Sequence, residues 1–418
     1  MRVWGTLLLL ACGAGAVAQE STHALEVCRL PAILEAAPTS MQHARRASPD
    51  CNPAVDGVRI EVDYTGFPQE AEAAFQRAVD VWGCLIRSAQ TVRVRATWVP
   101  LDASTLGSAG PVLFRDFEGA PARGVWYPAA LADALAGEDL GDGDPDIEAM
   151  FNSDFRAWHF GSDAPPEGRF DLTTVVLHEL GHGLGIIGAL TVEDGLGGFV
   201  SDRSRPFAYD LHVQDGFGIS LLDSRTFPIP SLRLADALES EVRFAGNAVA
   251  QAVGRSVPLY APSRWVPGVS LSHLSEDVFA AGTPDGLMTP FIARQETISE
   301  PGPAVCAMLA DLGWRLAGSC DALVGRLDDR AATLSVSRTG PNPFWSRTRL
   351  RVSSSAPTTL SAVLYDVQGR AIEDYGTVVL GVGRELDLEV VAPAASGVYF
   401  VRLTGAAETV SVPLTVVR

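Results

Sequence analysis

The order of apolar and polar residues predicts that the first part of the chain mixes strands with helices. Residues 58–66 alternate apolar and polar side chains, which is typical of a strand. Residues 68–86 carry apolar side chains near helical spacing, and residues 91–101 alternate again. A strand, a helix and a second strand in this order predict a β-α-β unit at the start of a domain.

Further along the chain, helical patterns become fewer and turn signals more frequent. Residues 103–170 are rich in glycine, proline and aspartate, and they include the acidic turn cluster GEDLGDGDPD at residues 137–146. Residues 189–302 contain few long periodic runs. Residues 303–312 place apolar side chains on one helical face before Gly313, which indicates the last helix of a domain.

From residue 339 the pattern changes to short alternating segments separated by glycine, proline, serine and asparagine. Several short strands within roughly 80 residues predict a small all-β sandwich. The sequence therefore predicts an α+β fold for the larger N-terminal part and an all-β fold for the C-terminal part. Residues 321–338 are predicted to link the two.

Residues 1–18 have the layout of a secretory signal peptide. A basic start is followed by an apolar run and by the small residues Ala16-Val17-Ala18, and cleavage is expected after Ala18. The alternative is a lipobox at residues 9–12, which would place a lipid on Cys12. Both interpretations send the mature chain out of the cytoplasm.

The net charge limits the partners of the protein. The chain has 418 residues, 47% of them hydrophobic, and a formal net charge of −18 at pH 7. Such a chain repels nucleic acid and anionic membrane surfaces, so neither is expected as its main partner. After the signal peptide no apolar stretch is long enough to cross a bilayer, and no transmembrane segment is expected in the mature chain.

Removal of the signal peptide leaves an odd number of cysteines, namely Cys28, Cys51, Cys84, Cys306 and Cys320. In an oxidising compartment Cys306 and Cys320 are placed to close a short loop, and two of the other three are available to pair. One cysteine is left over. A spare N-terminal cysteine is able to bind an active-site metal as a latency device, although no recognisable motif surrounds Cys28 or Cys51.

The main chemical signal is the segment TTVVLHELGHGLGIIG at residues 173–188, where His178, Glu179 and His182 interrupt an apolar run. Residues four apart lie on one face of a helix, so His178 and His182 would offer two imidazoles to one zinc ion. Glu179 is placed to take the proton of a zinc-bound water, and the hydroxide would attack a polarised carbonyl. The alternative is a pair of ordinary core histidines.

The helix that would carry these residues has recognisable ends. Asp171 and Thr173 are candidate N-cap residues, and Gly185 permits a left-handed turn after the last helical residue. The extended pattern H-E-x-x-H-x-x-G-x-x-H matches as far as Gly185. Its last position is Gly188, which has no side chain to bind a metal, so a third ligand must come from elsewhere.

A catalytic zinc usually takes three protein ligands and leaves one position for water. The histidines downstream of the motif are His212 and His273, and His273 is followed by Met288 in a Gly-Leu-Met-Thr-Pro turn. A methionine turn beneath the metal is a metzincin feature. Carboxylates remain alternative third ligands, and the candidates are Glu193, Asp194 and Asp210.

This combination of motifs resembles the leishmanolysin-like metzincins, in which the third histidine follows a long insertion and shortly precedes the methionine turn. The resemblance covers roughly residues 55–318. It implies that His178, His182 and His273 bind zinc, that Glu179 is the general base, and that Met288 forms a hydrophobic floor below the metal.

The C-terminal part resembles the sorting domain used by type IX secretion in Bacteroidetes-like bacteria. The resemblance rests on four windows, which are Pro341-Asn342-Pro343-Phe344, Tyr365-Asp366-x-x-Gly369-Arg370, Gly397-Val398-Tyr399-Phe400 and the terminal Arg418. It implies export through the periplasm to the cell surface or the medium, with the type IX machinery as a partner. An adhesive or substrate-binding module is the alternative.

These observations predict a secreted zinc endopeptidase that acts on proteins or peptides. Its predicted parts are a signal peptide (1–18), an N-terminal segment or pro-region (19–54), a metzincin-type peptidase domain (55–320), a linker (321–338) and a β-sandwich (339–418). Two other readings are a surface adhesin or binding protein with a structural or degenerate zinc site, and a zinc hydrolase of a non-peptide substrate. Calcium is a second candidate cofactor at the acidic cluster, although the EF-hand spacing is missing and a solvated loop is favoured.

Overall fold

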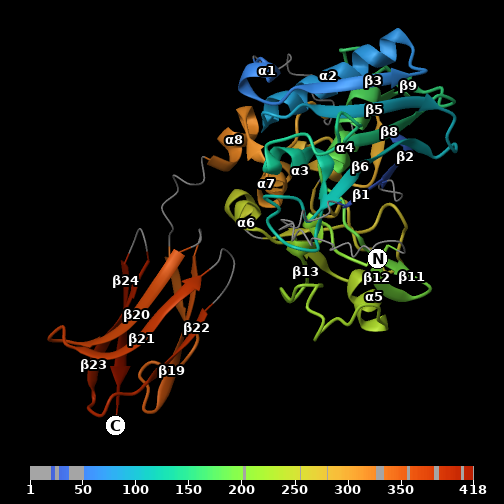
Figure 1. Cartoon of the computed structure of the whole chain (residues 1–418). Helices are drawn as coiled ribbons and strands as arrows, with labels where there is room; N and C mark the ends of the chain where they lie inside the picture. Colours follow the sequence, from blue (N-terminus) through green and yellow to red (C-terminus); the bar gives the residue numbers. More distant parts are fainter. Residues whose placement is uncertain are drawn as a thin grey trace, which may run out of the picture.

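The computed structural model shows an α+β fold followed by an all-β unit (Figure 1). It describes residues 20–23, 28–36, 51–200, 204–254, 256–279, 281–325, 334–354, 358–380, 386–405 and 409–417. The predicted signal peptide, Cys12 and Arg418 lie outside these residues.

A mixed sheet forms the centre of the N-terminal part, with the strand order β16-β2-β6-β8-β5-β3. Strands β3, β5 and β8 are parallel, and β6 is antiparallel to both β8 and β2. Two further strands, β1 and β7, pair with the far end of β6. The bounds are β1 Glu20–His23, β2 Cys28–Ala36, β3 Ile60–Thr65, β5 Val92–Val99, β6 Thr105–Arg115, β7 Trp126–Pro128, β8 Ile147–Asn152 and β16 Ile292–Arg294.

Helices α2 and α4 pack together beside this sheet, and α4 also contacts β6. The helices are α1 Pro53–Asp56, α2 Gln69–Leu85, α3 Ala129–Ala136, α4 Leu172–Gly183, α5 Leu232–Leu238, α6 Asn247–Val253, α7 Pro303–Leu312 and α8 Gly318–Gly325, with 3₁₀ turns η2 Ala208–His212 and η3 Pro284–Met288. Short strands are β4 Ile86–Arg87, β9 Trp158–His159, β10 Phe170–Asp171, β11 Leu190–Glu193, β12 Leu196–Phe199, β13 Val213–Asp215, β14 Val242–Phe244, β15 Val257–Pro258 and β17 Arg315–Leu316.

The predicted β-α-β unit is confirmed, because α2 connects the parallel strands β3 and β5. The helix predicted before Gly313 is confirmed as α7, and Gly313 ends it at φ 115°. Strand β6, by contrast, lies in a region that the sequence marked only by turn signals. It is almost wholly buried, so it shows no alternation, and a Cβ at Gly107 would come within 3.0 Å of the Phe151 ring.

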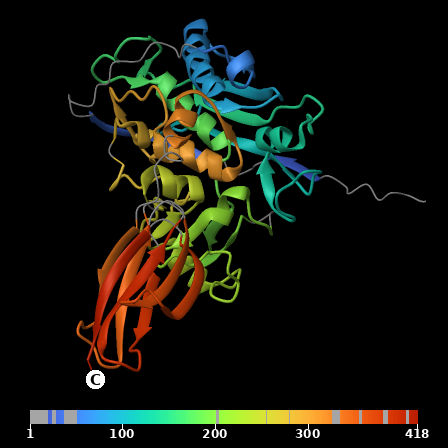
Figure 2. The ribbon, with the colours of Figure 1, turned by 90° about the vertical axis from the view of Figure 1, so that its left-hand side faces the viewer.

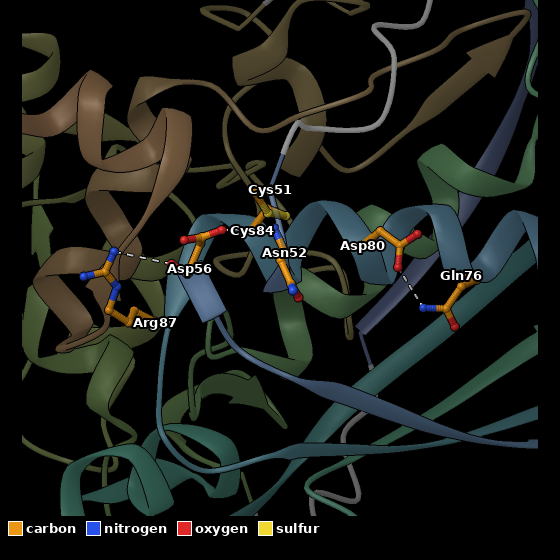
Figure 3. Close-up of a disulfide and its surroundings, with 7 residues drawn as sticks. All are labelled: Cys51, Asn52, Asp56, Gln76, Asp80, Cys84 and Arg87. Carbon is orange, nitrogen blue, oxygen red and sulfur yellow. Dashed lines mark hydrogen bonds between the residues drawn. A yellow bond between two sulfur atoms is a disulfide. The ribbon is translucent and has the colours of Figure 1, made fainter. Parts of the chain in front are cut away.

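Two disulfides stabilise the N-terminal part. Cys51 pairs with Cys84 and so ties the residues before α1 to the end of α2 (Figure 3), and Cys306 pairs with Cys320 between α7 and α8. The second pairing confirms the predicted short loop. Disulfides persist in oxidising compartments, so they indicate an extracellular protein. None of the helices in the described ranges is long and apolar enough to span a bilayer.

The C-terminal part is a sandwich of two antiparallel sheets with its own apolar core (Figure 2). One sheet has the order β18-β19-β22 and the other β21-β20-β23-β24. The bounds are β18 Leu334–Arg338, β19 Arg347–Ser354, β20 Thr358–Asp366, β21 Ala371–Leu380, β22 Leu386–Val391, β23 Gly397–Thr404 and β24 Thr409–Val416. Strand β18 and most of α8 fall within the predicted linker 321–338, which is therefore not irregular throughout.

The windows that carry the sorting-domain resemblance form turns and strand contacts in this sandwich. The Asn342 side chain accepts a hydrogen bond from the Thr415 amide at 2.7 Å. The Asp366 carboxylate accepts hydrogen bonds from the amides of Gln368 and Arg370 and from the Arg370 guanidinium. The Tyr399 hydroxyl donates to the Ala395 carbonyl at 2.9 Å. These three windows thus stabilise a turn or a strand end.

The acidic loop at residues 137–146 covers two buried carboxyl groups. Asp133 is 1% exposed and Asp146 is 3% exposed, and Asp139 pairs with Arg93 at 2.5 Å. No group of three metal-binding side chains forms in this loop, which lies wholly within the described residues. Burial, together with nearby carboxylates, raises the pKa of Asp133 to about 6 and that of Asp146 to about 7.

These raised pKa values predict a pH-dependent stability. Between about pH 4 and pH 7 the folded state holds protons that the unfolded state has released, so the free energy of unfolding falls as the pH rises. Asp133→Asn keeps an acceptor for the Leu140 amide and removes one of the buried charges. We expect this substitution to raise the free energy of unfolding by about 1–2 kcal/mol at pH 8 and to make that free energy depend less on pH. Denaturant unfolding at several pH values measures this, with exposed Asp144→Asn as the control; an equally steep pH dependence in Asp133→Asn would contradict it.

Candidate metal centre

Helix α4 carries the motif and is buried along its whole length. Its N-cap is Asp171, whose carboxylate accepts hydrogen bonds from the amide and hydroxyl of Thr174 at 3.0 and 2.7 Å, so the cap is Asp171 rather than Thr173. Two indole groups hold the middle and the C-terminal end of the helix, since Trp82 donates to the Leu177 carbonyl and Trp314 to the Leu184 carbonyl. The chain then leaves the helix through Gly185 at φ 122°.

Three histidines converge at this helix. His178 and His182 come from α4, and His273 comes from the loop between β15 and η3. The Nε2 atom of His178 lies 3.0 Å from that of His182 and 3.2 Å from that of His273. All three side chains are buried, and they are the one set of three potential metal ligands found in the part of the chain that the structure describes. The cluster can bind a metal ion.

Backbone carbonyls orient the three rings. The Nδ1 atoms of His178, His182 and His273 each face a carbonyl oxygen, at 2.6, 2.7 and 2.7 Å. A carbonyl accepts only, so each Nδ1 carries the proton and each Nε2 presents a lone pair to the common centre. Burial lowers the pKa of His178 to about 4 and that of His273 to about 3, and it lowers the pKa of His182 strongly. The three rings are therefore neutral, as metal binding requires.

Glu179 lies beside this cluster as an uncompensated carboxyl group. Its side chain is fully buried, and neither oxygen has a hydrogen-bond partner of normal geometry among the described residues. Burial raises its pKa well above the ordinary value, and the nearby backbone of Ala109 in β6 lowers it to a smaller extent. A buried carboxyl group without partners is costly, so it points to a functional requirement.

Met288 lies directly against α4. It is fully buried, and a Cβ at Gly181 would come within 2.8 Å of its sulfur atom. Its carbonyl accepts from the Leu274 amide, next to His273, and the preceding carbonyl, of Leu287, faces His178. The turn η3 therefore holds two of the three histidines as well as packing against the helix.

The other predicted third ligands lie elsewhere. Asp210 is buried but accepts the amides of Ala189, Leu190 and Phe207, so it organises the loop after Gly188. His212 stacks on Phe244. Glu193 and Asp194 are exposed. A Cβ at Gly188 would lie 2.8 Å from the Asp210 carboxylate, which leaves no room for a histidine at that position.

Sequence reasoning missed the groups that orient the cluster. The carbonyls of Leu287, Ile186 and Val269 carry no signal, because every residue has such a group. Glu296 was also missed. Its buried carboxylate accepts the amides of Gly282 and Ala293, and so it braces the segment around η3.

No protein-family model and no curated protein matches the sequence. Among solved structures, the chain is similar to dimeric latent PorU from Porphyromonas gingivalis, at 16% identity and a TM-score of 0.18; the match covers 21% of this chain and 10% of PorU. It is also similar to the CARDB domain of a Pyrococcus furiosus protein in complex with di-metal ions, at 17% identity and a TM-score of 0.17. This match covers 21% of this chain and 90% of the CARDB domain. At these TM-scores neither neighbour informs the function.

Proposed function

We propose that the protein is a secreted, zinc-dependent endopeptidase similar to the leishmanolysin-like metzincins. One observation carries the proposal. Three neutral imidazoles direct their Nε2 lone pairs to one buried point, and an uncompensated carboxyl group on the same helix lies next to them. This arrangement supplies three protein ligands and a separate general base, which are the groups that metal-assisted hydrolysis requires.

The donor set fits zinc. Zn–N distances of about 2.0–2.1 Å in a tetrahedral site place the nitrogen atoms about 3.3 Å apart, close to the 3.0 and 3.2 Å between the Nε2 atoms here. Imidazole is a preferred ligand of zinc, and three histidines leave a fourth position open. A zinc ion bound at this site would supply Lewis-acid activation of water and of the substrate carbonyl.

The residues of the chain then have distinct tasks. Glu179 takes a proton at a carboxylate oxygen and returns it to the leaving amine. The three carbonyls keep the histidine rings in the productive tautomer. Met288 is buried against Gly181 and so supports the helix that carries two of the histidines.

The experiment compares the full chain with a Glu179→Gln variant, and measures cleavage of an unfolded protein and zinc content on the same samples. Cleavage by the parent alone, with about one zinc per chain in both, supports the proposal. Zinc in both without cleavage would favour the adhesin or binding protein. Glu179-dependent hydrolysis of a small ester with no peptide cleavage would favour a hydrolase of another substrate class.

We also propose that the C-terminal sandwich is a type IX sorting domain, so that the peptidase is exported through the periplasm with this machinery as its partner. The support is the order of the sequence windows, together with the turn and strand contacts that three of them make. A chain that ends at residue 338 is expected to accumulate in the periplasm while the full chain leaves the cell. Fractionation with an antibody measures this, and equal export of both chains would contradict it.

A further inference from the structure

The space that a side chain would need at Gly188 is filled by residues from two other segments. A Cβ at Gly188 would lie 2.8 Å from the Asp210 carboxylate and 2.9 Å from the Leu271 side chain. It would also lie 3.3 Å from the ring of Tyr209. Tyr209 and Asp210 belong to η2, and Leu271 lies two positions before His273. The glycine thus lets η2 reach the segment that carries the third histidine.

The turn η2 is fixed to the segment that follows the motif helix. The Asp210 carboxylate accepts hydrogen bonds from the amides of Ala189 at 2.9 Å and Leu190 at 3.4 Å. The Tyr209 ring is 1% exposed, and its centroid lies 5.2 Å from that of Phe244. Tyr209 therefore has a defined position relative to α4 and to the two histidines on that helix.

The Tyr209 hydroxyl is directed at the backbone before His273. It donates a hydrogen bond to the Leu271 carbonyl at 2.9 Å, and both groups are buried. Leu271 has φ 74°, a left-handed conformation that is strained for a residue with a side chain and persists only where the surroundings hold it. The Leu271 amide donates to the Tyr260 carbonyl, and the Tyr260 amide donates to the His273 carbonyl. The hydroxyl thus helps to hold a strained backbone two residues before the third histidine.

Further hydrogen bonds hold the residues on either side of His273. The Gly188 amide donates to the Ser272 hydroxyl at 3.2 Å. The Leu274 amide donates to the Met288 carbonyl at 2.8 Å. His273 is therefore held from one side by η2 and the segment after α4, and from the other side by η3.

We propose that Tyr209 is a positioning residue for His273. Its hydroxyl sets the place of the Leu271 carbonyl, and with it the place of His273, relative to His178 and His182 on α4. The inference rests on the proposed function and deepens it. A ligand from a distant loop strengthens zinc binding only when the surrounding groups hold it at the right distance from the other ligands. Tyr209 acts through the backbone before His273 and is not itself a metal ligand.

The test compares Tyr209→Phe with Tyr127→Phe in the full chain, and a titration with a competing chelator measures the zinc affinity. Tyr127 is 2% exposed, and its hydroxyl accepts a hydrogen bond from the Ala122 amide at 3.0 Å, so the control also loses one hydrogen bond of a buried tyrosine. We expect Tyr209→Phe to weaken zinc binding by about 10-fold and Tyr127→Phe to leave it unchanged. The melting temperatures of the metal-free proteins show how much stability each substitution costs.

A double-mutant cycle separates positioning from a general loss of structure. In a chain that already carries His273→Ala, the substitution Tyr209→Phe is expected to cause no further loss of zinc affinity, because the hydroxyl acts through His273. An equal loss of affinity in both backgrounds would overturn the proposal and would assign the hydroxyl to the fold alone. Unchanged zinc affinity in the single variant Tyr209→Phe would also overturn it.

The readout is metal binding instead of turnover, so this proposal and the endopeptidase proposal fail separately. If zinc binding depended on Tyr209 through His273 but the parent chain cleaved no protein, the endopeptidase proposal would fail and the positioning role would stand. If the parent chain cleaved an unfolded protein and Tyr209→Phe bound zinc as tightly as the parent, the positioning role would fail and the endopeptidase proposal would stand.

Discussion

Replacement of Glu179 by glutamine is expected to lower kcat for peptide cleavage by about 10²- to 10⁴-fold while leaving the zinc content unchanged. Glutamine has nearly the same shape as glutamate, but its amide does not accept a proton at neutral pH. In the proposed site the three histidines supply the metal ligands and Glu179 does not, so the metal should remain bound. Steady-state kinetics on an unfolded protein, with metal analysis of the same samples, measure both effects.

The stability of this variant gives an independent check. The carboxyl group is buried without hydrogen-bond partners of normal geometry among the described residues, and its raised pKa shows that the fold disfavours its charge. A neutral amide should therefore leave the melting temperature unchanged or raise it. Glu193 is an exposed glutamate in β11, and Glu193→Gln serves as the control. This control should change neither the activity nor the melting temperature. An active Glu179→Gln enzyme would remove Glu179 from the role of general base.

The parts of the fold that the sequence predicted are those with local signals. Helix α4 begins at a side-chain cap and ends at a glycine with positive φ, and both features belong to neighbouring residues. The unit formed by β3, α2 and β5 has the apolar periodicity of elements with one buried face. Strands β23 and β24 of the C-terminal sandwich show the same alternation.

The parts that the sequence did not predict depend on packing between distant segments. Strand β6 is buried on both faces, so it shows no alternation of apolar and polar residues. Its glycines and proline resemble turn signals, but at Gly107 the small residue leaves room for the ring of Phe151. Strand β2 pairs with residues more than two hundred positions away in β16, and no local pattern indicates such a partner. The Asp210 carboxylate accepts hydrogen bonds from amides that lie between Gly188 and Asp210 in the sequence. Only the folded loop brings these amides to the carboxylate.

The candidate metal centre depends on both local sequence spacing and packing between distant segments. His178 and His182 lie one helical turn apart, so their common face follows from spacing alone. His273 is separated from His178 by 95 positions, and only the packing of η3 against α4 brings it to the same point. The choice of His273 over other third ligands therefore rested on a family resemblance, and the structure now gives it a geometry that a mutation can test.

Substitution of His273 by alanine is expected to weaken zinc binding by more than about 100-fold, since the loss of even an outer-shell partner costs about 10- to 100-fold. Two histidines remain, and two ligands do not hold a catalytic zinc under dilution. Cleavage of an unfolded protein should disappear at limiting zinc and return in part when zinc is added in excess. Metal titration with a competing chelator measures the affinity directly.

His212→Ala is the matched control for this experiment, because His212 also lies downstream of the motif but stacks on Phe244 away from the cluster. It should retain the parent's zinc affinity and activity. The melting temperatures of the metal-free proteins show whether either substitution unfolds the chain, which separates loss of a ligand from loss of the fold. Zinc binding that survives His273→Ala but not His212→Ala would move the third ligand to His212, and the convergence of the three Nε2 atoms would then lack a functional explanation.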